Sequence, residues 1–336
     1  MIERAGRYTL RMTQGPVITG YAGVAGKKEG EGPLAEDFDF IFEDTSVGEK
    51  SWEKAESTLL REAVSRAMDK AGKSPSDLDF LLAGDLLNQC IGTTFGLRKF
   101  NIPFMGMYGA CSTMALTLSM AAILTESGAA NVCGAATSSH FCSAERQFRF
   151  PLEYGGQRTP TAQWTVTGAG CSILEPTGSG PKISAVSIGR ICDLGIKDAN
   201  NMGAAMAPAA AETISSFLED TGTKPSDYDL ILTGDLGFVG AELLTRLLAE
   251  ENIDISQVHD DCGMMIYDRE GQDVHAGGSG CGCSGSVLNT NILKRIENQE
   301  LKNVLFVGTG ALMSPTSAQQ GESIPGIAHA VLITNN

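Results

Sequence analysis

The amino-acid sequence predicts an α/β fold made of two similar halves. The chain has 336 residues, of which 42% are hydrophobic and 19% are charged, enough for one large core or two related ones. A twelve-residue segment occurs twice, as PSDLDFLLAGDL at 75–86 and as PSDYDLILTGDL at 225–236, with eight identical positions at a constant offset of 150. Helical and strand-like patterns alternate around each copy, which is typical of layered α/β proteins.

A predicted helix precedes each copy of the repeat. These helices cover residues 52–72 and 206–222, and the apolar residues of the first, from Leu59 to Met68, recur at helical spacing. Each ends in a glycine, Gly72 or Gly222, which suits the left-handed position that follows many helices. Pro-Ser-Asp and an apolar strand come next in both halves.

A second pair of elements also recurs. Residues 109–121 and 278–293 both begin with glycine, small residues and cysteine and continue as a predicted helix. Apolar strands follow at 130–139 and 303–312. Each half therefore has the order helix, strand, helix, strand, which predicts a pseudo-symmetric pair of five-stranded domains with mostly parallel central strands.

The boundary between the halves is predicted from composition. The stretch EPTGSGPKIS at 175–184 is rich in glycine, proline and serine, which are residues of turns and linkers. We therefore place the first half at residues 1–177 and the second at residues 178–336.

Charge and hydropathy exclude several classes of partner. The formal net charge is −15 and the isoelectric point is near 4.7, which disfavours nucleic acid and simple docking on anionic lipid. The N-terminus has no apolar run of signal-peptide length, and polar residues interrupt the apolar region at 114–136, so we expect no membrane span. The absence of a G-x-x-x-x-G-K-[ST] motif gives no support for nucleotide-driven transport.

The cysteines predict one special position. Nine cysteines at irregular spacing indicate a reduced compartment and mostly buried thiols. Cys111 differs because it lies between small residues at the start of a predicted helix, where backbone N–H groups attract anions and lower thiol pKa values. Cys281 and Cys283 lack the second pair of a zinc site, and Gly280-x-Gly-x-x-Gly285 is better explained by tight packing than by dinucleotide binding.

The duplicated plan resembles the thiolase fold, and most nearly the β-ketoacyl-acyl-carrier-protein synthase III type of condensing enzyme. GACST at 109–113 resembles the nucleophile turn of those enzymes, and VLFVGTGALMSP at 304–315 resembles their glycine-rich closing strand. The resemblance implies five layers in the order α-β-α-β-α.

Several longer segments resemble a narrower family, the stage V sporulation protein AD (SpoVAD) family of spore-forming bacteria. The segments are KKEGEGPL (27–34), AGDLLNQ (83–89), ATSSHFCSAERQFRFPLEYGGQRTPTAQWTVTG (136–168), LTGDLGFVGAELL (232–244), HDDCGMMIYD (259–268) and GGSGCGCSG (277–285). The resemblance implies non-catalytic binding of dipicolinic acid, or of its calcium chelate, for uptake into the developing spore, and a link to germination.

The same resemblance implies the protein's setting. We expect a cytoplasmic protein, peripheral on the forespore or spore inner membrane, that acts as the soluble subunit of a membrane channel or transport complex. The resemblance to the thiolase fold implies a homodimer formed through edge strands of the first half. Attachment would come through the other subunits. No cofactor is expected beside the ligand, although the ligand brings calcium if it enters as the chelate.

Residues at the expected catalytic positions argue against an enzyme. In the condensing enzymes that Cys111 suggests, a histidine follows the strand at 229–234 and an asparagine opens the late glycine-rich turn. This chain has Asp235 and Ser279 near those positions, and neither replaces the oxyanion donors well. We therefore expect no turnover, while an acyltransferase that uses Cys111, or a scaffold that only binds proteins, stays open as an alternative.

A dipicolinate site needs donors for two carboxylates and an apolar slot for the ring. Arginine and lysine near the start of a helix would supply such donors. The predicted ligand-binding residues are Lys28, Cys111, Ser112, His140, Arg146 and Arg149. Arg149 is the weaker choice because it alternates with Phe148 and Phe150, as on a strand face.

Two other groups of residues receive structural predictions. Asp85 and Asp235 are copies of one another in the repeat, so turn roles are favoured over catalysis, with a calcium contact conceivable. His259 and His275 are placed around a predicted hairpin. We expect no protein-bound metal site.

Overall fold

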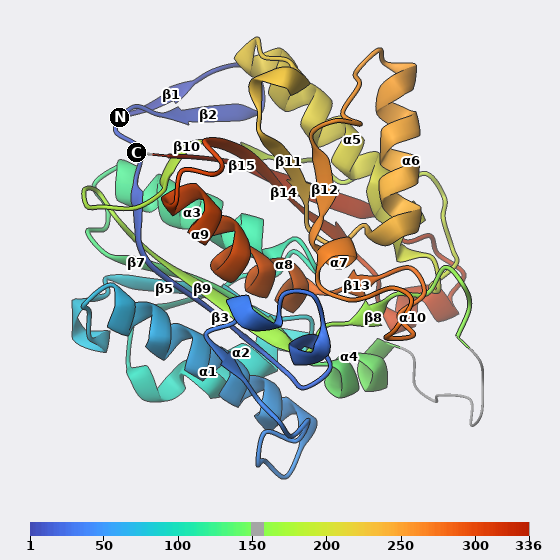
Figure 1. Cartoon of the computed structure of the whole chain (residues 1–336), viewed down its shortest axis with the longest axis horizontal. Helices are drawn as coiled ribbons and strands as arrows, with labels where there is room; N and C mark the ends of the chain where they lie inside the picture. Colours follow the sequence, from blue (N-terminus) through green and yellow to red (C-terminus); the bar gives the residue numbers. More distant parts are fainter. Residues whose placement is uncertain (149–157, 336) are drawn as a thin grey trace.

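The protein is described by a computed structural model that covers residues 1–148 and 158–335 (Figure 1). The strands of its main sheet follow the order β12-β11-β14-β15-β10-β3-β9-β7-β5-β6. Those of the first half are β3 (Val17–Ala25), β9 (Gly168–Glu175), β7 (Cys133–Ser139), β5 (Phe80–Gly84) and β6 (Phe104–Gly106). Those of the second half are β10 (Lys182–Ile188), β15 (Gly326–Thr334), β14 (Asn303–Ala311), β11 (Leu230–Thr233) and β12 (His259–Asp261).

The helices form three layers around the two runs of strands. They are α1 (Trp52–Lys70), α2 (Ile91–Leu97), α3 (Thr113–Glu126), α4 (Phe141–Phe148), α5 (Met202–Thr221), α6 (Gly237–Glu250), α7 (Cys262–Met265), α8 (Cys281–Val287), α9 (Leu293–Glu297) and α10 (Pro315–Gln319). In Figure 1, α1 lies below the first-half strands, α5 lies above the second-half strands, and α3 and α8 lie between. The five-layer α-β-α-β-α arrangement predicted from sequence is therefore present.

The two halves repeat the same strand plan. β5 and β11 lie within the repeated segments 75–86 and 225–236, and each is the fourth strand of a five-strand run. Each pairs in parallel with both of its neighbours, β5 with β6 and β7, and β11 with β12 and β14. β9 and β15 are antiparallel to both of their partners, so the expectation of mostly parallel strands is correct for only part of each sheet.

Local contacts of the repeat are also duplicated. Asp79 accepts hydrogen bonds from the backbone N–H groups of Asn131 and Val132, just before β7. Asp229 accepts two from Lys302 and Asn303, at the start of β14. Gly72 and Gly222 follow α1 and α5 with φ values of 66° and 67°, as the sequence predicts.

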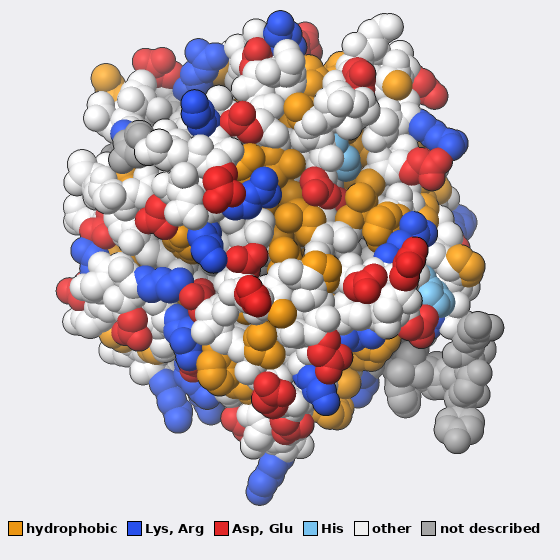
Figure 2. Space-filling model, in the orientation of Figure 1, with side chains coloured by type: hydrophobic (Ala, Val, Ile, Leu, Met, Phe, Trp, Pro, Cys, Tyr) orange, Lys and Arg blue, Asp and Glu red, His pale blue; other side chains and the backbone are white. Residues whose placement is uncertain are grey.

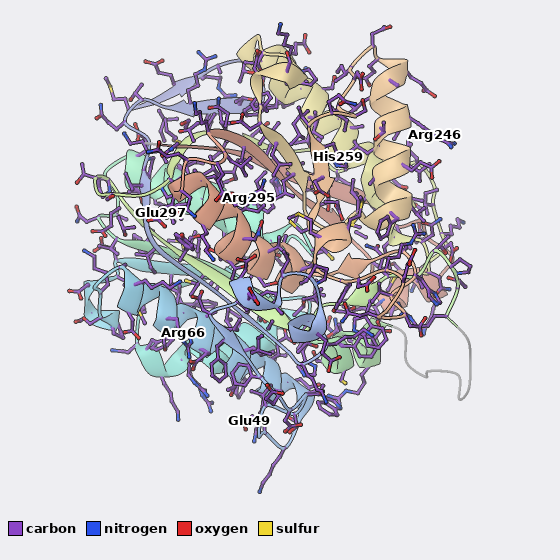
Figure 3. The ribbon with its side chains drawn as sticks, viewed as in Figure 1. Glu49, Arg66, Arg246, His259, Arg295 and Glu297 are labelled. Carbon is purple, nitrogen blue, oxygen red and sulfur yellow. The ribbon has the colours of Figure 1, made fainter. Side chains whose placement is uncertain are left out.

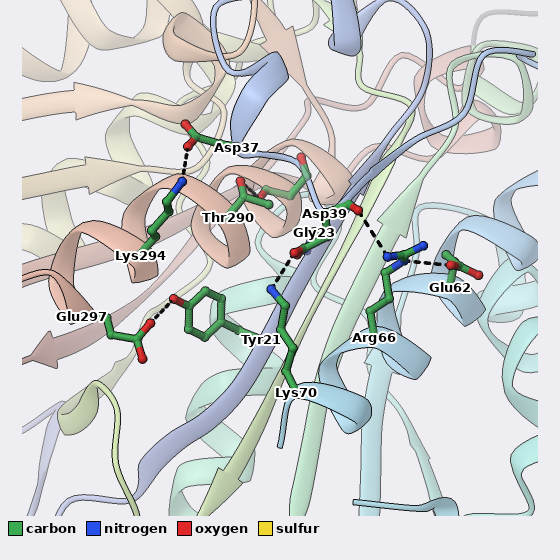
Figure 4. Close-up of polar contacts among 11 residues, drawn as sticks. Tyr21, Gly23, Asp37, Asp39, Glu62, Arg66, Lys70, Thr290, Lys294 and Glu297 are labelled. Carbon is green, nitrogen blue, oxygen red and sulfur yellow. Dashed lines mark hydrogen bonds and ion pairs between the residues drawn. The ribbon is translucent and has the colours of Figure 1, made fainter. Parts of the chain in front are cut away.

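Polar contacts connect the halves outside the sheet. The loop before β4 (Phe40–Ile41) provides Asp37, which pairs with Lys294 of α9 at 3.2 Å. Tyr21 of β3 donates to Glu297 of α9 at 2.6 Å (Figure 4). Figure 3 shows Arg295 and Glu297 on α9 and Arg66 below them on α1. The N-terminal hairpin, β1 (Ile2–Arg4) and β2 (Thr9–Met12), pairs with β10, so the first residues of the chain lie on the second half's sheet.

One predicted turn is wrong. His259 does not begin a hairpin but starts β12, which pairs in parallel with β11 and leads directly into α7. His275 lies in the connection before β13 (Gly278–Ser279). The parallel partner of β12 lies more than twenty residues earlier and is reached through α6, a connection that local turn signals do not reveal.

The surface mixes charges of both signs. Figure 2 shows acidic and basic side chains interspersed over the viewed face, with hydrophobic side chains gathered near its centre. Among the residues that the structure describes, no helix is long and apolar enough to cross a membrane.

Candidate functional site

A cavity of about 60 Å³ lies at the start of α3, where the two halves meet. Its apolar walls come from Leu86, Ala144, Phe148, Met202 and Met313, and its polar groups from Tyr108, Cys111, Glu145, Ser279 and Thr165 of β8 (Trp164–Thr165). A groove of about 330 Å³ shares Tyr108, Phe148 and Met313 with this cavity and continues outward along residues 87–89 and 312–315. The site therefore combines a small inner cavity with a larger outer groove.

A sharp turn places Cys111 in the cavity wall. Ala110 has a φ of 50°, a left-handed conformation that a non-glycine residue adopts only at some cost. The Ser112 and Thr113 hydroxyls donate to Gly109 O and Ala110 O, each at 2.6 Å, and close the first turn before α3. Cys111 thus lies at a helix start, as the sequence predicts, with part of its surface exposed to the cavity.

Asp235 lies beside Cys111 and is fully buried. It follows β11 and accepts hydrogen bonds from Gly280 N at 2.7 Å and from the Thr309 hydroxyl at 2.8 Å. The Cys111 thiol lies close enough to this carboxyl group for the two to influence each other's pKa. Burial and the Asp235 carboxyl group raise the pKa of Cys111 well above its usual value, so the thiol stays protonated.

Ser279 also reaches this position. Its hydroxyl donates to Asp235 at 3.3 Å, and Ser279 lines the cavity. Of the two residues that replace the expected histidine and asparagine, Ser279 lines the cavity and Asp235 is buried behind it, beside Cys111. A carboxyl group at this place disfavours the thiolate form of Cys111.

A second buried acid lies close to Asp235. Asp261 accepts hydrogen bonds from the Thr233 hydroxyl at 2.7 Å and from the N–H groups of Leu236 and Gly237 at 2.8 and 2.9 Å. Burial, together with the charge of Asp235, raises the pKa of Asp261 to about 7. The turn after β11 is thus bound to β12 through this carboxyl group.

The corresponding turn of the first half is built differently. Asp85 accepts from Leu87 N at 2.8 Å and from both the N–H and the hydroxyl of Thr93 at 2.6 Å. It therefore has the turn role that the sequence predicts. Glu56 of α1 lies beside it and is also buried, and burial followed by the charge of Asp85 raises the pKa of Glu56 to about 8.

The other predicted ligand residues do not line the cavity with Cys111. The His140 ring contacts Thr45 O at 2.8 Å and stacks on Trp52, and burial lowers its pKa. Ser112 is fully buried, and its hydroxyl is used within its own turn.

The predicted basic residues point to other places. Lys28 donates to Gln272 O and lies 4.2 Å from the centre of the Trp164 ring. Arg146 forms an ion pair with Glu53 in a separate groove. Arg149 lies outside the described residues. Their role in ligand binding stays a prediction.

The helical geometry of α4 explains this difference. Residues 141–148 form a helix in which Ala144, Glu145 and Phe148 face the cavity, whereas the predicted ligand residue Arg146 faces away. The i, i+4 spacing of Ala144 and Phe148 is the sequence signal that would have identified them.

All nine cysteines are described, and all are free thiols. Burial is the first cause that raises the pKa of each, including Cys281, whose thiol donates to Ser138 O at 3.0 Å behind the cavity. Burial therefore disfavours the thiolate form at each of these positions.

Comparison with solved structures identifies the fold. The 3-oxoacyl-[acyl-carrier-protein] synthase III of Aquifex aeolicus VF5 matches with a TM-score of 0.59 and 15% identity, over 95% of this chain and 100% of that chain. The cerulenin-bound OleA structure of Xanthomonas campestris matches with a TM-score of 0.59 and 12% identity, over 99% of this chain and 100% of that chain. The fold is therefore that of the thiolase-like condensing enzymes.

Sequence comparison is more specific. The model of the family described as Stage V sporulation protein AD (SpoVAD) matches residues 6–334. The Stage V sporulation protein AD of Bacillus subtilis (strain 168) is 46% identical over 318 residues, which is 94% of each chain. On these matches, and in agreement with the segments recognised in its sequence, the chain belongs to the stage V sporulation protein AD family.

Proposed function

We propose that this protein binds dipicolinate, free or as its calcium chelate, in the Cys111 cavity and does not transform it. In this proposal it serves uptake of the ligand into the developing spore, as a peripheral subunit of a membrane complex at the forespore membrane. Family membership supports the sporulation role, because the relative is named for stage V of sporulation. The ligand and the complex are the parts that need testing.

The buried Asp235 carboxyl group beside the Cys111 thiol is the observation that supports binding without turnover. A condensing enzyme needs a thiolate to attack a thioester. Here burial and an adjacent carboxyl group both favour the protonated thiol. The position of the nucleophile is retained while its activation is absent.

The cavity also suits a flat, partly polar ligand. Leu86, Phe148 and Met313 provide apolar surface for a pyridine ring, and hydroxyl groups lie at its edge. Among the described lining residues there is one carboxylate, Glu145, and no lysine or arginine. Charge complementarity therefore favours the neutral one-to-one calcium chelate over the free dianion.

Calorimetry with dipicolinate, with and without calcium, tests this function. We expect saturable heat with the chelate, and weaker or no heat with the free dianion. Ala311→Leu fills the cavity and should abolish binding, whereas Ala129→Leu, the same change at an exposed position, should not. Equal affinity in both variants, or no heat with either form of the ligand, would reject the proposal. Weaker binding in Arg146→Ala would show that the groove that contains Arg146 takes part in ligand binding.

A condensing enzyme is the second candidate, because Cys111 lies partly exposed at a helix start in the fold of such enzymes. Incubation with acyl-coenzyme A followed by mass spectrometry distinguishes the two. A stable acyl adduct that disappears in Cys111→Ala would establish the enzyme. An unmodified Cys111 would support binding alone.

We also propose that the protein forms a homodimer through β6. This strand is an edge of the main sheet, and its segment FMGMYG has no charged residue to discourage pairing. Phe95, Phe104 and Tyr108 expose 48%, 40% and 47% of their surface nearby. Sedimentation should show a dimer for the native chain and a monomer for Phe104→Lys, while a native monomer would exclude this interface.

A further inference from the structure

Two buried carboxyl groups face one small space behind the cavity. Glu56 of α1 and Asp85 at the end of β5 expose 1% and 0% of their surface. A Cβ atom at Gly92 of α2 would lie 3.2 Å from Asp85 Oδ2 and 3.3 Å from Glu56 Cδ, so both groups border this glycine. Two charged carboxylates this close and this buried repel strongly, and such a pair shares one proton.

The hydrogen bonds show which group keeps the charge. Asp85 accepts two backbone N–H bonds and one hydroxyl bond, all from Leu87 and Thr93, which suits a carboxylate. Glu56 receives only hydroxyl groups, Ser143 at 2.7 Å and Ser138 at 3.3 Å. A hydroxyl can also accept a hydrogen bond, so these partners suit a protonated Glu56 equally well.

Other titratable groups on the surrounding elements do not neutralise the pair. Cys90 and Cys281 lie nearby with pKa values raised by burial, so both are uncharged. The His140 ring points to Thr45 O, and Arg146 of α4 is paired with Glu53 at the surface. No nearby cation among these groups compensates the two carboxyl groups, so the shared proton keeps the charge of the pair at −1.

The pair is connected to the wall of the cavity. Asp85 precedes Leu86, a lining residue, and binds the N–H of Leu87. Gln147 of α4 fastens the same loop, because its side chain donates to Leu86 O at 3.2 Å and accepts from Asn88 N at 2.9 Å. The loop ends in two consecutive left-handed residues, Gln89 and Cys90, with φ values of 55° and 50°. Such a strained loop depends on its anchors.

We propose that Glu56 is a positioning residue. When Glu56 is protonated, Asp85 carries the only negative charge of the pair, and its hydrogen bonds hold the loop Leu86–Cys90 at the cavity mouth. Ligand binding is thereby linked to proton uptake. Glu56 itself touches no ligand. Loss of its proton places two negative charges beside Gly92 and weakens the bonds that anchor the loop. The structural part of this proposal does not depend on the identity of the ligand, whereas the binding part rests on the proposed function.

Amide hydrogen exchange of the full-length protein tests the structural part. Between about pH 5 and about pH 8, residues 86–93 of the native chain should lose protection relative to Glu56→Gln by up to about tenfold for each pH unit, and the difference should level off above the folded-state pKa of Glu56, which is about 8. Glu62→Gln, the same change at a half-exposed position on the same helix, should behave like the native chain. Equal protection in the native chain and Glu56→Gln at every pH would overturn the proposal.

Calorimetry with calcium dipicolinate over the same pH range tests the binding part. Affinity should fall above about pH 8 in the native chain and stay constant in Glu56→Gln. If the ligand fails to bind at any pH, the proposed function fails while the exchange experiment still decides the role of Glu56. If Glu56→Gln does not fold, Asp85→Asn serves instead, because it also leaves at most one charge in the pair. A pH-independent affinity in the native chain would refute the linkage.

Discussion

The two Gly-Asp-Leu turns end equivalent strands, yet their aspartates bind different parts of the molecule. Asp85 uses its hydrogen bonds within its own turn and the helix that follows. Asp235 binds Gly280 and Thr309, which are far away in sequence, and lies beside Cys111 of the other half. The two turns therefore have the same place in the scaffold, but only the second one lies against the cysteine of the opposite half.

Each aspartate has a second buried acid beside it, and these neighbours also differ. Glu56 beside Asp85 relies on two serine hydroxyls. Asp261 beside Asp235 is bound by backbone N–H groups and by Thr233. The first arrangement suits a neutral acid, and the second also supports a charged one.

The largest expected effect concerns the pH dependence of stability. The pKa of Asp261 is raised from 3.8 to about 7 in the folded chain, so its stabilising protonation is complete below about pH 4 and is lost as the pH rises through 7. The loss amounts to about 4 kcal/mol. Urea denaturation across pH should show this slope in the native chain and a flatter one in Asp261→Asn.

Glu56 provides a second test, because its protonation affects stability up to a higher pH than that of Asp261. Its pKa is raised to about 8, so the slope that Glu56→Gln removes should continue to higher pH than the slope that Asp261→Asn removes. Unchanged slopes in both variants would show that neither acid is protonated by folding.

Removal of each turn aspartate tests the comparison directly. Asp235→Ala leaves the buried N–H of Gly280 and the hydroxyl of Thr309 without their acceptor, and should lower the free energy of unfolding by about 3 kcal/mol. Asp85→Ala also leaves buried donors without an acceptor, but it removes the electrostatic repulsion between Asp85 and Glu56. We therefore expect the free energy of unfolding to fall by only about 1 to 2 kcal/mol. Equal losses in urea denaturation would contradict the difference between the turns.

A smaller effect concerns the reactivity of Cys111. Asp235→Asn removes the carboxyl group that opposes the thiolate, and iodoacetamide should modify Cys111 about tenfold faster near neutral pH. Peptide mass spectrometry measures the rate. Asp229→Asn, at the opposite end of β11, provides the control and should leave the rate at Cys111 unchanged. Equal rates in the native chain and Asp235→Asn would show that burial alone controls the thiol.

The smallest effect should be the same in both halves. Asp79 and Asp229 each accept two backbone N–H bonds at the start of a strand. Alanine at either position should lower the free energy of unfolding by about 1 kcal/mol. A clear inequality between Asp79→Ala and Asp229→Ala would mean that the scaffold itself has diverged.

Much of the fold could be predicted from the sequence because the repeat covers a whole helix–strand unit. The repeat located β5 and β11, and the apolar runs located β7 and β14. The antiparallel strands β9 and β15 were not foreseen, since their partners lie far apart in the chain and leave no local signal. The prediction of a hairpin near His259 is wrong for the same reason, because the partner of β12 is the distant strand β11.

The site could be predicted only where backbone position determines it. The start of a helix placed Cys111, and the end of a strand placed Asp235 opposite it. Side chains on α4 depend on the rotation of that helix, so Arg146 faces away where Phe148 faces the cavity. Glu56 had no sequence signal, because a glutamate on an amphipathic helix normally faces water.

The thiols have a consequence for chemical ageing. Every cysteine of the chain is free, and burial raises the pKa of each. Peroxides attack the thiolate and not the thiol, so the reactive fraction is small at all nine positions. Burial of the thiols therefore limits sulfenic acid formation and accidental cross-linking in a chain that contains nine cysteines.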